Sequence, residues 1–256
     1  MRSDNCRMVR RFVGGDAVPG GSSGLLRAGR GDMFTGPVFF ENRADAGRRL
    51  AQAVAVEAPP EPLVMALPRG GVPVAFEIAT YLRAPLEVLI VRKIGAPGHQ
   101  EFGLGALVDG EEAELVLNRE AVRLVRPPRG YIAAEAERQR AEIARRRVLY
   151  LGDREPHSPR DRNVVLVDDG IATGGTIRAA IQALRRTGVR SLLLAVPVAP
   201  ASALASLRPS VDGIVCLSTP AFFRAVGLHY RDFEQTSDAE VMTLISRARA
   251  GGCDDA

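Results

Sequence analysis

The segment VVLVDDGIATGGT, residues 164–176, constrains the fold of this chain more than any other. Its first four residues are apolar, a run typical of a strand that is buried on both faces of a parallel sheet. Asp168 and Asp169 then stand at the carboxyl end of that strand, where open α/β sheets bind their ligands. The segment therefore predicts a buried strand, a short loop that faces a ligand, and a helix.

The loop after the acidic pair has the composition of an anion site. Its glycines allow the backbone to turn tightly and to approach a ligand, and its threonines offer hydroxyl donors. These residues are Gly170, Thr173, Gly174, Gly175 and Thr176. The residues that follow have helical spacing up to a stop at Gly188, so the free N–H groups of that helix point at the loop. An anion belongs there, and the carboxylates beside it suit a diol or a metal ion.

Two other classes of enzyme have an acidic motif after a strand, and neither fits this sequence. A nucleoside triphosphatase needs Gly-Lys-Ser or Gly-Lys-Thr in its phosphate loop, and the only lysine of the sequence, Lys93, follows Arg92. A phosphatase aspartate motif would need a second carboxylate at the position of Gly170. An ordinary strand, turn and helix with a solvated acidic pair is the remaining alternative.

Residues 164–176 resemble the signature of the type I phosphoribosyltransferases, which move the ribosyl phosphate of 5-phosphoribosyl 1-diphosphate onto a nitrogenous base. The resemblance implies that Asp168 and Asp169 meet the ribose hydroxyls. It assigns the 5-phosphate to a cradle formed by Ile171, Ala172, Thr173, Gly174, Gly175 and Thr176. It also implies Mg²⁺, bound mainly through substrate oxygens, with the acidic pair as candidate protein ligands.

A second segment, ALPRGGVPVAFEIA at 66–79, resembles the pyrophosphate loop of the same family. A strand is expected at 63–65 and a helix after the glycines. The resemblance assigns Arg69, Gly70 and Gly71 to the diphosphate. It also implies a cis peptide bond before Arg69. Taken by itself, the pattern fits a plain strand-to-helix turn equally well.

A third segment, VLIVRKIGAPGHQEFGLGAL at 88–107, predicts a strand with Arg92 and Lys93, followed by a mobile loop within 95–105. It resembles the lid of adenine-type members of the family, where an Arg-Lys pair precedes Glu-Tyr-Gly. The matching triplet here begins at Glu101. The resemblance makes Glu101 catalytic and the basic pair substrate-binding, whereas a solvated surface loop is the alternative.

Position 172 bears on the identity of the base. Family members that act on 6-oxopurines usually carry an acid there, and Ala172 cannot transfer a proton. This departure disfavours hypoxanthine and guanine. It leaves an adenine-like base or another heterocycle open.

The rest of the sequence alternates predicted strands and helices. Strands are expected at 192–198 and 213–217 with a short helix from Ala201 between them, and an amphipathic helix is expected at 131–148. This order predicts an α/β fold with a doubly wound, mainly parallel sheet. The resemblance adds a small hood over the base, although the same aromatic residues also suit a core. The hood residues are Phe222, Phe223 and Tyr230.

Composition sets the domain limits. Residues 1–32 are rich in glycine and lack apolar periodicity, which predicts a disordered tail. One phosphoribosyltransferase domain with its hood elements is expected at 33–249, and a flexible end at 250–256.

Composition also bears on the location and partners of the protein. The three cysteines show no disulfide or zinc spacing, which suits the cytoplasm. The sequence has no apolar run of membrane-spanning length, and its net charge of +4 does not call for nucleic-acid binding.

The three segments together predict a phosphoribosyltransferase of a bacterial branch that serves nucleotide salvage. Its partners would be 5-phosphoribosyl 1-diphosphate and a small, purine-like base, and a homodimer stays open as its assembly. The alternative is a non-catalytic regulator or sensor that binds the same diphosphate sugar or a nucleotide. Arg69, Lys93 and Glu101 favour the enzyme, because regulators of this fold often lose such residues.

Overall fold

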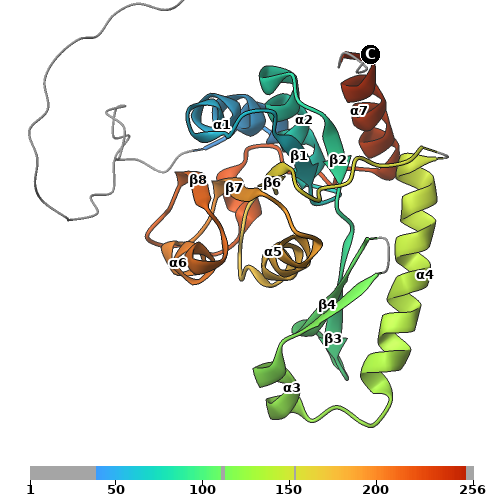
Figure 1. The fold of residues 1–256 in the computed structure, drawn as a ribbon. Helices are drawn as coiled ribbons and strands as arrows, with labels where there is room; N and C mark the ends of the chain where they lie inside the picture. Colours follow the sequence, from blue (N-terminus) through green and yellow to red (C-terminus); the bar gives the residue numbers. More distant parts are fainter. Residues whose placement is uncertain (1–38, 111–112, 153, 252–256) are drawn as a thin grey trace, which may run out of the picture. The chain divides into compact units, whose positions relative to one another are not determined.

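The computed structural model describes residues 39–110, 113–152 and 154–251 (Figure 1). The predicted tail at 1–32, the predicted domain start at residue 33 and most of the predicted C-terminal end lie outside the described residues. The side chains of Gln100 and Glu101 are also outside the description.

In the described part, the centre of the fold is a five-stranded sheet in the order β2-β1-β6-β7-β8, with every neighbouring pair parallel. The strands β1 and β6 are buried along their whole length, as their apolar sequences predict. The predicted parallel strands are therefore confirmed. Their bounds are Leu63–Ala66 for β1, Leu86–Val88 for β2, Asn163–Val167 for β6, Ser191–Val198 for β7 and Gly213–Ser218 for β8.

Helices cover both faces of this sheet, which confirms the doubly wound arrangement (Figure 1). The core on one face is shared by α1, α2 and α7, and the core on the other by α5 and α6. Gly47 lets α1 approach α2 closely, because a Cβ atom there would lie 2.8 Å from the carbonyl oxygen of Val74. The bounds are Arg43–Glu57 for α1, Gly71–Leu82 for α2, Gly175–Thr187 for α5, Ala201–Leu207 for α6 and Asp238–Gly251 for α7. Short 3-10 turns span Arg208–Ser210 and Val226–His229.

A smaller antiparallel sheet follows β2. Within the described ranges it has three strands, β3 (Val91–Ala96), β4 (His99–Val108) and β5 (Glu114–Leu117), in that order. The prediction of a loop within 95–105 is therefore wrong. Glycine here serves close pairing, because a Cβ atom on Gly105 would lie 2.4 Å from the carbonyl oxygen of Val116. We call β3, β4 and β5 the hairpin sheet.

Two helices follow the hairpin sheet. Helix α3 spans Arg119–Val125, and α4 spans Tyr131–Leu151, which confirms and extends the helix predicted at 131–148. Apolar residues of α3 and α4 pack on the hairpin sheet around Ile94 and Leu104. No helix in the described ranges is both long and apolar enough to cross a bilayer.

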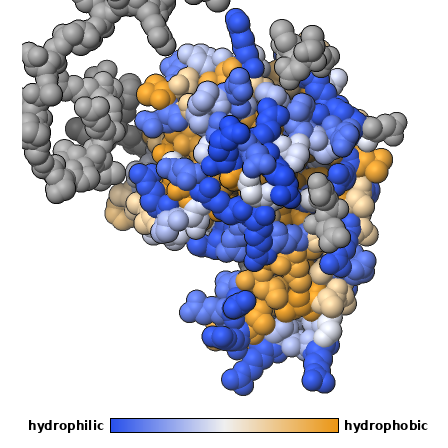
Figure 2. Space-filling model, viewed as in Figure 1, coloured by the Kyte–Doolittle hydropathy of each residue, from blue (hydrophilic) through white to orange (hydrophobic). Residues whose placement is uncertain are grey.

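The space-filling view shows apolar surface gathered over the hairpin sheet, whereas the parts around the parallel sheet present mainly polar residues (Figure 2). Exposed apolar side chains of the hairpin sheet and α3 include Phe102, Leu117 and Leu124. Exposed apolar side chains also occur outside the hairpin sheet, for example Val56 of α1 and Tyr81 of α2.

Candidate active site

Two of the predicted motifs meet at the carboxyl ends of neighbouring strands. Ala66 of β1 pairs with Val167 of β6, so the residues after these strands emerge side by side. A Cβ atom on Gly70 would lie 2.0 Å from Oδ2 of Asp169, and one on Gly71 would lie 2.9 Å from the carbonyl oxygen of Val167. Both glycines are therefore needed for the two motifs to approach each other, because any side chain would occupy the space between them.

The loop after β1 has the predicted backbone. The peptide bond between Pro68 and Arg69 is cis, as predicted. Nη1 of Arg69 lies 3.8 Å from Oδ1 of Asp238 at the start of α7, and Tyr150 of α4 donates a 2.5 Å hydrogen bond to the same oxygen. Burial, reinforced by that hydrogen bond, raises the pKa of Tyr150 to about 12. Arg69 is thus a partly exposed cation beside the glycines, in a long and weak ion pair.

The carboxyl groups of Asp168 and Asp169 are partly desolvated. The backbone N–H of Asp169 donates to Oδ1 of Asp168 at 2.9 Å, and Nε of Arg43 donates to Oδ2 of Asp169 at 2.8 Å. Burial, and next the charge of Asp169, raises the pKa of Asp168 well above its ordinary value. Burial also raises the pKa of Asp169, and Arg43 opposes that effect. Hydroxyl donors or a cation at this position would relieve the cost of holding two partly desolvated charges side by side.

The predicted phosphate loop presents donors to solvent. Ala172, Thr173, Gly175 and Thr176 are exposed, and helix α5 begins at Gly175 with no side-chain cap on its first N–H groups. Gly174 has a φ of 75°, a conformation that glycine adopts at little cost. Uncapped N–H groups at a helix start attract anions.

Ile171 has a different place in this loop from the other residues. Its side chain is buried, and its backbone N–H donates to the carbonyl oxygen of Val198 at 2.9 Å. This amide is already used, so Ile171 anchors the loop to β7 in this structure.

The predicted hood residues divide into packed and open side chains. Tyr230 is 6% exposed, lies between Phe40 and Phe233, and donates a 2.6 Å hydrogen bond to the carbonyl oxygen of Asp169. Its ring is therefore covered, and its hydroxyl holds the backbone of Asp169. Phe223 stacks on His229 with ring centroids 5.5 Å apart, whereas Phe222 is 94% exposed. Of the three rings, that of Phe222 is the open one.

The basic residues of the predicted lid belong to the hairpin sheet. Nε of Arg92 donates to Gln139 of α4 at 2.9 Å, and burial, then the nearby Arg146, lowers the pKa of Arg92. Lys93 is exposed on β3, and its aliphatic chain lies near Gly103. Glu101 belongs to β4, but its side chain is not described. The structure thus joins the first two motifs with each other and holds the third on a separate sheet.

Arg43 is the site residue that sequence reasoning missed. It is the first residue of α1, whose N-cap is Asn42, and it reaches Asp169 across 126 positions of sequence. Nothing in its local sequence separates it from the other arginines of an arginine-rich chain. Only the fold brings it to the acidic pair.

The acidic pair fits a magnesium ion that is bound mainly by substrate. Carboxylate oxygens are suitable ligands, and Mg²⁺ commonly takes one or two of them together with substrate phosphates. In the part of the chain that the structure describes, no group of three or more His, Cys, Asp and Glu residues gathers into a metal cage. Asp168 and Asp169 are the residues that would hold the ion.

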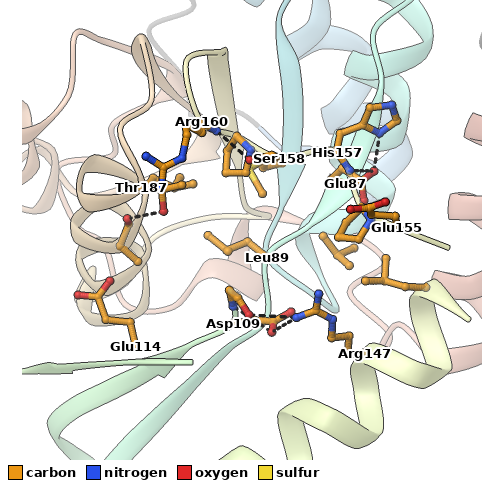
Figure 3. Close-up of a pocket in the computed structure, with 18 of the residues that line it drawn as sticks. Glu87, Leu89, Asp109, Glu114, Arg147, Glu155, His157, Ser158, Arg160 and Thr187 are labelled. Atoms are coloured by element: carbon orange, nitrogen blue, oxygen red, sulfur yellow. Dashed lines mark hydrogen bonds and ion pairs between the residues drawn. The ribbon is translucent and has the colours of Figure 1, made fainter. Parts of the chain in front are cut away.

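A separate cavity of about 360 Å³ lies along the C-terminal half of α5 (Figure 3). Its lining includes the apolar Leu89 and several polar side chains that contact one another. Nη1 of Arg147 lies 3.3 Å from Oδ1 of Asp109, and Nδ1 of His157 lies 2.7 Å from Oε1 of Glu87. None of the residues predicted for the sugar phosphate is among the described residues that line it.

Comparisons with known proteins identify the family of the chain. A sequence model of the phosphoribosyl transferase domain matches residues 40–231, and the chain belongs to that family. The family predicted from the three motifs is thus confirmed.

Two curated relatives come from Mycobacterium tuberculosis strains H37Rv and CDC 1551 / Oshkosh, and both are provisionally named phosphoribosyl transferases. Each is 45% identical over 210 residues, which is 82% of this chain and 47% of the relative. The chain therefore spans about half the length of these relatives. The crystal structure of TT1426 from Thermus thermophilus is 41% identical, with a TM-score of 0.72, and the match covers 82% of this chain and 99% of that one.

Proposed function

We propose that this chain is a phosphoribosyltransferase that moves the 5-phosphoribosyl group of 5-phosphoribosyl 1-diphosphate to a purine-like base and releases pyrophosphate, in cytoplasmic nucleotide salvage. The observation that carries the proposal is the meeting of two motifs at the ends of β1 and β6, where Gly70 leaves room for the Asp169 carboxylate. Membership of the phosphoribosyl transferase family supports the same activity.

In this proposal the sugar phosphate lies across the carboxyl end of β6. Asp168 and Asp169 accept hydrogen bonds from the ribose hydroxyls, which suits two carboxylates whose pKa values are raised by desolvation. The 5-phosphate binds the uncapped N–H groups at the start of α5 and the hydroxyls of Thr173 and Thr176.

The diphosphate binds the loop after β1. Breaking the anomeric bond develops positive charge on the ribose and negative charge on pyrophosphate, so carboxylates favour the first and cations the second. We assign the leaving group to Arg69 and the backbone of Gly70 and Gly71, which follow β1 beside the acidic pair. Mg²⁺, when bound through substrate oxygens and the acidic pair, would further neutralise the diphosphate.

The lid and the hood complete the proposed site. We assign Arg92 and Lys93 to substrate binding and Glu101 to chemistry near the base, with β3 and β4 as the lid that carries them. Phe222 is the hood residue with an open ring for base stacking.

The proposed lid predicts that Glu101→Gln lowers the single-turnover rate much more than the affinity for the diphosphate sugar, whereas Lys93→Ala weakens that affinity as well. Equal single-turnover rates for Glu101→Gln and the parent would remove Glu101 from the chemistry.

The accepting base is found by measuring pyrophosphate release with a panel of bases, in the presence of Mg²⁺ and 5-phosphoribosyl 1-diphosphate. We expect release to depend on an adenine-like base, to be weak with hypoxanthine and guanine because of Ala172, and to be lost in Asp169→Asn. Binding of the diphosphate sugar without release across the whole panel would support the regulator or sensor instead.

A further inference from the structure

Arg43 has a fixed and largely buried place beside the proposed ribose site. Its side chain is only 12% exposed although it is charged. The start of α1 is held there by Phe40, whose N–H donates to the carbonyl oxygen of His229 at 2.9 Å and whose carbonyl oxygen accepts from Arg231 at 2.8 Å. The N-cap Asn42 then sets the first turn, with its side chain accepting from Asp45 at 2.9 Å.

The guanidinium of Arg43 uses distinct atoms for distinct partners. Nε donates to Oδ2 of Asp169 at 2.8 Å, and Nη1 donates to the carbonyl oxygen of Glu234 at 2.7 Å. The carbon between these nitrogens lies 3.8 Å from the centre of the Phe233 ring. Only a planar, forked cation can make such contacts together, because the ammonium group of lysine lacks both the fork and the flat face.

Asp169 is thereby held by both its side chain and its main chain. Arg43 takes Oδ2, while Tyr230 donates to the carbonyl oxygen at 2.6 Å. The same Arg43–Asp169 contact is an ion pair between side chains that are only 12% and 15% exposed. The contact with Arg43 therefore uses Oδ2 of the carboxylate.

We propose that Arg43 is a positioning residue of the ribose site, which orients the Asp169 carboxylate so that its second oxygen accepts from a ribose hydroxyl. This inference rests on the proposed function. Arg43 touches no reacting atom in this account. It acts through Asp169 and is itself held by the segment at Phe233 and Glu234.

The test compares two phosphate ligands by calorimetry. Ribose 5-phosphate has the ring hydroxyls, and tetrahydrofurfuryl phosphate has the same ring and phosphate without them. Arg43→Gln should lower the affinity for ribose 5-phosphate about tenfold, which is the effect of one charge-assisted hydrogen bond. It should change the affinity for tetrahydrofurfuryl phosphate by less than about twofold. Arg43→Lys should recover only part of the loss, because it keeps the charge without the fork.

Arg48→Gln is the matched control. It removes an arginine from the same helix whose side chain is 59% exposed and pairs with Glu77 rather than with Asp168 or Asp169. This variant should bind both ligands with the affinity of the parent. Should Arg43→Gln fail to fold, the test rests on Arg43→Lys. Its affinity for ribose 5-phosphate should then fall more, relative to the parent, than its affinity for tetrahydrofurfuryl phosphate.

Parental affinity of Arg43→Gln for ribose 5-phosphate overturns the inference, and so does an equal loss for both ligands. If the parent itself does not bind ribose 5-phosphate, the proposed function fails and the role of Arg43 fails with it. If the parent binds ribose 5-phosphate and Arg43→Gln binds it equally well, only the proposed role of Arg43 is overturned.

Discussion

Asp169 is confined by three neighbours from distant parts of the sequence. Arg43 binds its carboxylate, Tyr230 binds its carbonyl oxygen, and Gly70 leaves space for the side chain. The geometry of a carboxylate that must meet a hydroxyl depends on such support. At the scale of single residues, the site is therefore sensitive to small changes that leave its charges intact.

Gly70→Ala tests this sensitivity. The new Cβ atom would lie 2.0 Å from Oδ2 and 2.7 Å from Cγ of Asp169, so the carboxylate has to move. We expect at least about a tenfold loss of affinity for ribose 5-phosphate, with a destabilisation of about 1–3 kcal/mol from overpacking. Calorimetry and thermal unfolding measure the two effects.

Gly103→Ala is the stability control, because its Cβ atom would meet Lys93 at an ordinary contact distance of 3.5 Å. Its unfolding free energy should equal that of the parent. Unchanged affinity in Gly70→Ala would show that the position of Asp169 does not govern ribose binding.

The residues that were predictable from the sequence are contiguous ones. Asp168, Asp169 and the glycines of both loops stand directly after apolar runs, so their place at strand ends follows from local pattern. Arg43 was not predictable, because its role comes from a contact across 126 positions. The used amide of Ile171 likewise depends on a neighbouring strand that the loop's own sequence does not specify.

At the scale of elements, α4 links the hairpin sheet to the rest of the domain. It contacts β3, β4 and α7, and its own surface is stabilised by ion pairs within the helix. Glu142 accepts from Arg145 at 2.9 Å and from Arg146 at 2.7 Å. These hydrogen bonds, from Arg145 first and then from Arg146, lower the pKa of Glu142 to about 2.

Glu142→Gln should therefore show a pH-dependent loss of stability. A carboxyl group whose pKa is lowered by folding stabilises the protein above its ordinary pKa of 4.5, and this contribution disappears as the pH falls toward about 2. Because the pairs are partly exposed, we expect a loss of about 0.5 kcal/mol at pH 7. Denaturant unfolding of parent and variant between pH 7 and pH 3 measures the difference, which should shrink at the acid end.

Glu137→Gln provides the control on the same helix, since its carboxylate is 74% exposed and pairs with Arg140 alone among the described residues. It should leave the unfolding free energy unchanged. A difference for Glu142→Gln that stays constant over the whole pH range would contradict the ion-pair explanation.

Elements with a strong period were predictable, and the hairpin sheet was not. The helix of α4 and the parallel strands follow from apolar spacing. The glycines and proline within 95–105 indicated a loop, yet Gly105 is required by the close approach of β5. Pairing with a strand further along the chain thus overrode the local tendency toward a turn.

At the scale of the whole molecule, the order of strands creates the site. β1 and β6 are distant in sequence but adjacent in the sheet, which brings the loop of Arg69, Gly70 and Gly71 beside Asp168 and Asp169. The α/β class was predictable from alternation of strands and helices. The cavity beside α5 was not, because it arises between elements whose mutual packing no single segment specifies.

We propose that one domain spans 33–249, which predicts that the chain before it is dispensable for stability. The low apolar content of residues 1–32 gives them little burial to offset the entropy of ordering. A chain that begins at Met33 should melt at the same temperature as the full chain in differential scanning calorimetry. A large drop would show that the removed residues pack on the domain.

Direct titration of 5-phosphoribosyl 1-diphosphate with Mg²⁺ into the parent, Asp168→Asn and Asp169→Asn tests the central claim most directly. The control is Asp212→Asn, which removes a half-exposed carboxylate paired with Arg185 away from the acidic pair. Our account predicts saturable binding to the parent and the control, and affinities at least about tenfold weaker for the two site variants, whose fold is intact. No binding to the parent, or parental affinity in both site variants, would contradict it.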